Sequence, residues 1–283
     1  MIPIQPIVKA AEAITNAETI LITAGAGMGV DSGLPDFRGD KGFWQLYPSY
    51  AEKGLTFADL ANPTWFHTHP ERAWGFYGYR YNLYRDTQPH QGFQILKSWL
   101  ANKPNPGFVY TSNVDGHFQK AGFSHDQVYE CHGSINYLQC LRSDCNGKIW
   151  SANQLRLTID PQTLLATSEL PRCPDCGFYA RPNILMFNDW AWIAARAEQQ
   201  SERFHDWKQA TRHSDLVIIE IGAGVSVGKV RFISQTFNKA TLIRINPQDP
   251  QGPSNTISIA MPGLAALTAI EEILQSRYPE SQS

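Results

Sequence analysis

The sequence has no long hydrophobic run. No stretch approaches the roughly 18 uncharged apolar residues that a membrane-spanning helix requires, so the chain is not expected to cross a bilayer. The opening residues, MIPIQPIVKAAEAITNAET, lack the cationic start and the apolar segment of a secretory signal. These absences predict a cytoplasmic protein with no membrane partner.

The sequence also lacks an excess of charge of either sign. Lys and Arg number 24 and Asp and Glu number 26, which gives a formal charge of −2. Such a balance creates no field that would recruit nucleic acid, so we expect a small-molecule or protein ligand. Internal repeats and low-complexity linkers are absent too, and the 283 residues are expected to form one catalytic unit of unspecified oligomeric state.

Cysteine is scarce, and its five copies are an odd number. Four of them form two close pairs beside turn residues, namely Cys140 with Cys145 and Cys173 with Cys176. This spacing is typical of zinc ribbons and favours a metal site in a reducing compartment over disulfides. Because four thiolates close a tetrahedral shell, we expect a structural zinc, the alternative being four unrelated thiols.

Short, continuously apolar runs alternate with helical patterns at both ends of the chain. The runs are TILIT (19–23), GFVYT (107–111), DLVIIEIG (215–222), TLIRIN (241–246) and TISIAM (256–261). Continuous hydrophobicity is typical of strands that are buried on both faces, as in a parallel sheet. The sequence therefore predicts an α/β fold with a doubly wound, Rossmann-like parallel sheet.

Two segments interrupt this alternation. Residues 43–100 are rich in Trp, Tyr and Phe at helical spacing, and residues 136–182 are polar and hold the cysteine pairs. We expect both to be insertions that form a smaller domain, one part helical and the other zinc-binding. The Rossmann-like core of the single unit 1–283 would then comprise residues 1–42, 101–135 and 183–283.

The first apolar run leads into AGAGMGVDSGLPDFRG (24–39). Its small residues would let the backbone approach a pyrophosphate, and the N-terminus of the next helix would offer N–H groups. The Gly25-Ala26-Gly27 stretch alone is equally compatible with a plain tight turn. The acid, aromatic and arginine that follow in PDFRG favour a nucleotide site, because packing alone does not require them.

A second segment, TSNVDGHFQKAG (111–122), places Ser112, Asn113 and Asp115 directly after an apolar run. Asn and Asp are common turn formers, so the residue types alone indicate a loop. Their position at the end of a predicted strand favours a role in ligand binding, because ligands bind at strand ends in doubly wound sheets.

A third segment, YECHGSINYLQC (129–140), puts Cys131 beside His132. Neighbours on an extended strand point to opposite faces, so the two are not expected to act as nucleophile and base. Cys131 is expected to be a buried packing thiol. His132 ends a strand-like run, which favours a place in the ligand site over the alternative of a structural histidine.

Together these segments resemble the sirtuin family of NAD-dependent protein deacylases, over nearly the whole chain. The similar motifs are the glycine loop with PDFRG, TSNVDGHFQKAG, CHGSI, the cysteine pairs, ARPNILMFND and RIN at 244–246. The resemblance implies one set of cofactor-binding residues: Gly25, Ala26, Gly27, Asp36, Phe37, Arg38, Ser112, Asn113, Asp115, Gly222, Ala223, Gly224 and Asn246. It also implies that His132 is the general base acting on a ribose hydroxyl, with Asn113 as a second catalytic residue.

The implied activity is deacylation of protein lysine, in which NAD is cleaved to nicotinamide and O-acyl-ADP-ribose. The acyl-lysine peptide would lie as an added strand between Phe187 and the loop after residues 215–222. An NAD glycohydrolase or ADP-ribosyltransferase would use the same site, with water or another nucleophile attacking the ribose. A non-catalytic alternative is an NAD-sensing interaction module.

The helical insertion adds a finer expectation. WGFYGYRYNLYR places Tyr77 and Arg80 three residues apart, on one helix face. This spacing resembles the Tyr-x-x-Arg pair by which some sirtuins bind acidic acyl groups, and an arginine fork pairs well with a carboxylate. Succinyl- or malonyl-lysine would then be favoured over acetyl-lysine, the alternative being a packed helix with a solvated Arg80.

Several positions depart from the family pattern. Gly29 stands where serine is usual, Ser112 where glutamine is usual, Phe118 where histidine is usual, and Gly222-Ala223-Gly224 in place of GTS. Each change removes a contact to the cofactor or its surroundings, which is typically worth about 0.5–1.5 kcal/mol, so a weaker or altered NAD pose is expected. FND at 187–189 replaces FGE at the peptide edge.

Overall fold

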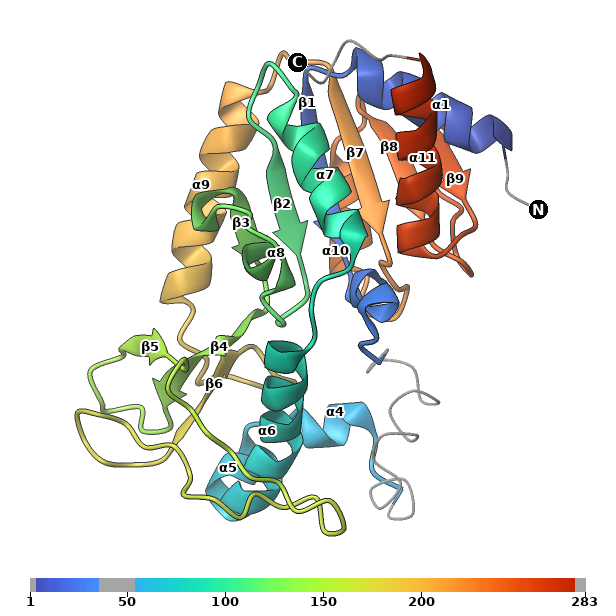
Figure 1. The fold of residues 1–283 in the computed structure, drawn as a ribbon. Helices are drawn as coiled ribbons and strands as arrows, with labels where there is room; N and C mark the ends of the chain where they lie inside the picture. Colours follow the sequence, from blue (N-terminus) through green and yellow to red (C-terminus); the bar gives the residue numbers. More distant parts are fainter. Residues whose placement is uncertain (1–3, 36–53, 278–283) are drawn as a thin grey trace.

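The computed structural model describes residues 4–35 and 54–277, and its centre is a six-stranded sheet in which all neighbours run parallel (Figure 1). In spatial order the strands are β3 (Val128–Glu130), β2 (Phe108–Thr111), β1 (Thr19–Ala24), β7 (Leu216–Ile221), β8 (Thr241–Ile245) and β9 (Thr256–Ile259). The order changes direction between β1 and β7, as in a doubly wound sheet. The predicted fold class and all five predicted strands are confirmed.

The central strand β1 shows why the apolar runs are continuous. Ile20, Ile22 and Ala24 pack into the core on one face of the sheet, and Leu21 packs into the core on the other. Every residue of β1 is buried. Alternating side chains point to opposite faces, so a strand covered on both sides is apolar at most positions, and the buried Thr23 is satisfied by a hydrogen bond with Ser234.

Helices cover both faces of this sheet (Figure 1). One face packs against α1 (Ile4–Asn16), α7 (Gln91–Ala101) and α11 (Gly263–Arg277). The other face packs against α9 (Ala195–Ala210) and α10 (Lys229–Thr236). Short turns of helix connect the strands: η1 (Ala26–Ser32), α8 (His117–Lys120) and η2 (His125–Gln127).

A smaller unit lies beyond the carboxyl ends of the parallel strands (Figure 1). Its antiparallel sheet has the order β5 (Ile149–Ser151), β4 (Gly133–Cys140) and β6 (Ala180–Ile184). Among the described residues its helices are α4 (Phe57–Leu60), α5 (Thr64–Thr68) and α6 (Pro70–Asp86). Sheet and helices share one apolar core that is rich in aromatic residues from α5 and α6.

Helix α7 belongs in sequence to the segment 43–100 that we expected in the smaller domain, but it packs on the large sheet. Phe93, Leu96 and Trp99 enter the core shared with α1 and α11. An amphipathic pattern predicts that a helix has a buried face, but it does not say which sheet that face covers. Among the described residues, no helix is both long and apolar enough to cross a membrane.

Candidate functional site

A cavity of about 520 Å³ opens between the two units. Its walls are mostly apolar with a few convergent polar groups, which is typical of a small-molecule site. The predicted site residues that line it are Ala26, Tyr77, Arg80, Ser112, Asn113, Asp115, His132 and Phe187. Residues from the predicted helical insertion and residues from the predicted core therefore line the same cavity.

Several polar residues of the cavity follow the ends of adjacent strands. Because parallel strands share a carboxyl edge, β2 delivers Asn113 and Asp115 next to the loop that follows β1. Asn113 donates from Nδ2 to the carbonyl oxygen of Gly25 at 2.9 Å, and its own N–H donates to Thr111 Oγ1 at 3.0 Å. Asn113 thus fixes the glycine loop against the end of β2.

The glycine loop itself crosses the loop after β7 at very short range. A Cβ added to Gly25 would lie 2.6 Å from the carbonyl oxygen of Gly222, and Gly222 has φ +61. The N–H of Gly27 donates to that same oxygen at 3.0 Å. Only glycine allows this crossing, which leaves Ala26 on the cavity wall and presents nearly bare backbone to a ligand. Such a surface fits the pyrophosphate of a dinucleotide.

Asn246 lies farther along the same edge, after β8, and does not line the cavity. It donates from Nδ2 to the carbonyl oxygen of Ala223 at 3.1 Å, and its Oδ1 accepts from the N–H groups of Gln248 and Asp249, each at 2.9 Å. Arg231 of α10 donates to the same Ala223 oxygen at 3.0 Å. Asn246 therefore shapes the loop after β7, and its contact with the adenine ribose stays a prediction.

His132 joins the large sheet to the small one, between β3 and β4. Its carbonyl oxygen accepts from the N–H of Leu185 at 2.9 Å. Gly133 has φ +76, and a Cβ there would lie 2.1 Å from the carbonyl oxygen of Asn183, so the residue after His132 must be glycine. Cys131 is buried in the core facing α9 and α10, as expected for a packing thiol, whereas His132 lines the cavity.

The helical insertion contributes Tyr77 and Arg80 from α6. Arg80 is only 6% exposed and lines the cavity, which excludes the alternative of a solvated arginine. Burial raises the pKa of Tyr77 to about 12, an effect that the positive charge of Arg80 partly offsets. The phenol of Tyr77 therefore stays protonated and able to donate a hydrogen bond at any ordinary pH.

The predicted peptide edge follows β6. The N–H of Phe187 donates to the carbonyl oxygen of Ala61 at 2.9 Å, and the residue is 44% exposed. Asp189, which stands in place of the family's glutamate, forms a buried ion pair with Arg181. The backbone bond of Phe187 and the ion pair of Asp189 thus hold the loop 187–189 beside the cavity. Ser226 and Val227, after β7, line the cavity too.

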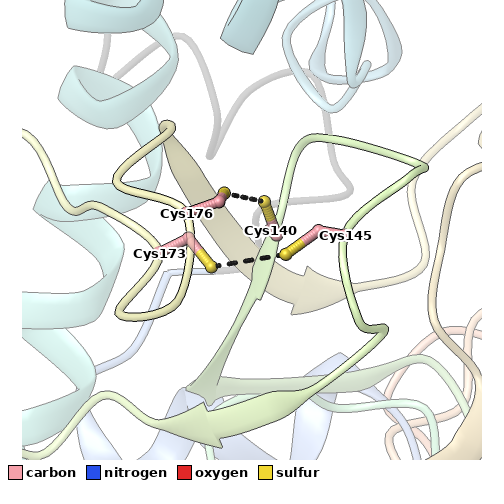
Figure 2. Close-up of side chains that lie close together, drawn as sticks. All are labelled: Cys140, Cys145, Cys173 and Cys176. Carbon is pink, nitrogen blue, oxygen red and sulfur yellow. Dashed lines mark hydrogen bonds between the residues drawn. The ribbon is translucent and has the colours of Figure 1, made fainter.

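Figure 2 shows the four paired cysteines converging from the end of β4 and the turn before β6. Sγ of Cys140 lies 3.6 Å from that of Cys176, and Sγ of Cys145 lies 3.8 Å from that of Cys173. Tetrahedral zinc with bonds of about 2.3 Å sets its sulfurs roughly 3.8 Å apart, so the cluster fits this ion. The predicted metal cluster is confirmed, and its closed thiolate shell suits a structural role.

Asp36, Phe37 and Arg38 lie outside the described residues. Phe57 and Tyr84 also line the cavity, although neither was predicted from the sequence. Tyr84 lies four residues after Arg80, and this helical spacing is the signal that would have found it.

His90 is hydrogen-bonded to the backbone that follows the glycine loop, and its protonation should make the stability of the protein depend on pH. The N–H of Gly92 donates to its Nδ1 at 3.0 Å, so the ring proton is on Nε2, which lies 2.9 Å from the carbonyl oxygen of Met28. Burial holds the pKa of His90 below its usual value, although the bond to Met28 and the charge of Asp31 oppose the shift and the nearby His117 adds to it.

A depressed folded-state pKa means that the unfolded chain binds the proton more readily, so the stabilisation from neutral His90 is present above about pH 6.5 and is lost as the pH falls. His90→Asn keeps an acceptor for the Gly92 N–H and removes the titration. Between pH 7 and pH 5 the melting temperature of the wild type should fall more steeply than that of His90→Asn. Parallel curves would contradict this assignment.

Comparisons with known proteins agree with this geometry. The model of the Sir2 family matches residues 25–228. An NAD-dependent protein deacylase of Aquifex aeolicus is 27% identical over 81% of this chain and 84% of its own. A probable bifunctional ADP-ribose hydrolase/ADP-ribosyltransferase of Fusarium oxysporum f. sp. cubense is 29% identical over 83% of this chain and 41% of its own. A crystal structure of a Sir2 homolog–NAD complex has TM-score 0.68 and 24% identity, covering 95% of this chain and 94% of that one. The chain belongs to the Sir2 family.

Proposed function

We propose that the protein is an NAD-dependent lysine deacylase acting on acylated protein or peptide and releasing nicotinamide and O-acyl-ADP-ribose. One observation carries the proposal: in a Sir2-family chain, His132, Asn113 and Asp115 line the same cavity as Tyr77 and Arg80. His132, Asn113 and Asp115 follow strands of the doubly wound sheet. Tyr77 and Arg80 come from helix α6 of the helical insertion. A cofactor end and an acyl end would thus share one space.

Each residue has a chemical task in this proposal. NAD supplies a ribose bond to a cationic ring, which breaks readily. His132 accepts a proton from a ribose hydroxyl, a task for which imidazole is the most suitable side chain near neutral pH. Asn113 holds the glycine loop through Gly25, and Asp115 is held in turn by the N–H of His117, which donates to its Oδ1 at 2.9 Å. The two thereby fix the nicotinamide end of the site.

The acyl end favours a negatively charged acyl group. A buried guanidinium on the cavity wall attracts a carboxylate through charge-assisted hydrogen bonds, and the protonated phenol of Tyr77 is a further donor. Succinyl- and malonyl-lysine fit these two residues better than acetyl-lysine does. The acyl-lysine peptide would enter between Phe187 and the Ser226–Val227 backbone.

The cysteines indicate where in the cell the protein works. Four clustered thiols can bind a metal only where they stay reduced, and we therefore propose that the protein is cytoplasmic. The structural zinc fits that placement, because thiolates and not disulfides hold the small unit together.

ADP-ribosyl transfer is the second candidate, favoured by the name of the Fusarium relative. It would use the same ribose-facing His132, with a protein side chain or water as the acceptor. The acyl-binding pair Tyr77 and Arg80 would then have no task, which is why deacylation is the preferred function.

Product analysis tests the choice. The purified protein is incubated with NAD and a panel of acetyl-, succinyl- and malonyl-lysine peptides, and the products are identified by mass. Deacylation predicts free lysine and O-acyl-ADP-ribose in equal amounts, with the acidic acyl groups turned over faster. Free ADP-ribose made without any peptide would indicate hydrolysis, and an ADP-ribosylated protein would indicate transfer. Binding of NAD without any product would indicate a sensing module.

A further inference from the structure

Tyr84 accepts two hydrogen bonds from Arg80 at the wall of the cavity. Arg80 donates to the phenol oxygen of Tyr84 from Nη2 at 2.8 Å and from Nε at 3.2 Å. The two residues are four apart on α6, so their side chains lie one turn apart on one helix face. Both line the cavity, and Tyr84 is only 5% exposed.

These two bonds fix the plane of the guanidinium. Nε and Nη2 together form one edge of the planar fork, and both point to a single oxygen atom. The end-on edge, formed by Nη1 and the second Nη2 hydrogen, is thereby directed away from Tyr84. An end-on edge of this kind pairs with a carboxylate through two parallel bonds.

The contact with Tyr84 orients Arg80 and adds no negative charge of its own. A phenol oxygen is a neutral acceptor, in contrast to the carboxylate that pairs with Arg181 or Arg244 in this protein. Four aromatic rings surround the guanidinium carbon at 5.4–5.8 Å from their centroids, those of Phe57, Phe76, Tyr77 and Tyr84. Ring faces stabilise a desolvated cation but do not neutralise it.

We propose that Tyr84 is a positioning residue for acyl specificity: by holding the guanidinium of Arg80 in one orientation, it makes the cavity selective for acyl chains that end in a carboxylate. This inference rests on the proposed deacylase function and deepens it. The selectivity belongs to the pair, because Arg80 supplies the charge and Tyr84 supplies the direction.

A double-mutant cycle tests this division of roles. Tyr84→Phe, Arg80→Met and the double variant are compared with wild type on succinyl- and acetyl-lysine peptides at saturating NAD. Tyr81→Phe is the matched control, since Tyr81 is another buried tyrosine of α6, whose hydroxyl donates to the carbonyl oxygen of Ala152 at 2.7 Å, away from the cavity lining.

Tyr84→Phe should lower the succinyl-to-acetyl ratio of kcat/KM by roughly tenfold, mainly through the KM for the succinyl peptide, because a bond to a charged group is lost. In the Arg80→Met background the same change should leave the ratio unaltered, since Tyr84 acts through Arg80. Tyr81→Phe should keep the wild-type ratio.

Three results would overturn the proposal. The ratio could fall equally in the Arg80→Met background, or fall equally in Tyr81→Phe, or wild type could deacylate acetyl-lysine and leave succinyl-lysine untouched. The last result leaves the deacylase function standing. If wild type turns over no peptide at all, the proposed function fails. Calorimetric binding of the succinyl and acetyl peptides to the same four variants then decides the role of Tyr84, with the same expected pattern in Kd.

Discussion

His132→Ala should reduce kcat for deacylation by roughly 10²–10⁴, the usual contribution of a general base. The expectation follows from position: His132 lines the cavity at the end of β3, and the backbone that carries it is fixed by Leu185 and Gly133. Removing the imidazole leaves the glycine loop and Asn113 in place, so NAD should still bind. Initial rates of product release, followed by mass, give the measurement.

A matched control separates chemistry from folding. His125 is an exposed histidine in η2 that does not line the cavity, and His125→Ala should keep wild-type rates. The thermal stabilisation of His132→Ala by NAD should equal that of wild type. Full activity in His132→Ala would refute the proposed role of this residue and favour the non-catalytic alternative.

Cys173→Ser should release the metal and unfold the small unit. A structural zinc site contributes about 10–16 kcal/mol of apparent folding free energy, and loss of one thiolate removes much of it. Because β4 carries Cys140 at one end and begins beside His132 at the other, this loss should also abolish activity. Metal analysis should find one zinc per wild-type chain, and the melting temperature of Cys173→Ser should fall by more than about 10 °C.

Cys131 supplies the control for this experiment. It is buried but lies in the core facing α9 and α10, apart from the four clustered thiols. Cys131→Ala should lose some stability from the small cavity it leaves, yet it should keep its zinc. Purified wild-type protein without zinc, or a Cys173→Ser variant that melts like wild type, would contradict the structural role of the metal.

The parallel sheet was predictable because the pattern that indicates a buried strand lies within a few consecutive residues. A strand covered by helices on both faces is apolar at most positions, and β1 and β7 display this in their residues, apart from Thr19 and Thr23 in β1 and Glu220 in β7. The cysteine cluster was predictable for a similar reason, since close cysteine pairs beside turn residues are typical of zinc ribbons. Both signals lie in short segments and need no knowledge of how distant parts meet.

The packing of the helical insertion was not predictable in the same way. Its aromatic residues indicate burial but not the surface that buries them, so α7 was expected in the smaller unit and instead packs on the large sheet. The same limit hid Phe57, because only tertiary packing brings it to the cavity, whereas Tyr84 could have been found from its helical spacing to Arg80. Tyr77 and Arg80 were found through the family resemblance, and the fact that they line one cavity with His132 is a property of the folded chain.

A crystal structure of the protein with bound NAD tests the central claim most directly. We expect the imidazole of His132 to lie within hydrogen-bond distance of a hydroxyl of the nicotinamide ribose, with the pyrophosphate against the crossing of Gly25 and Gly222. An imidazole remote from that ribose, or a dinucleotide bound outside the cavity, would contradict it.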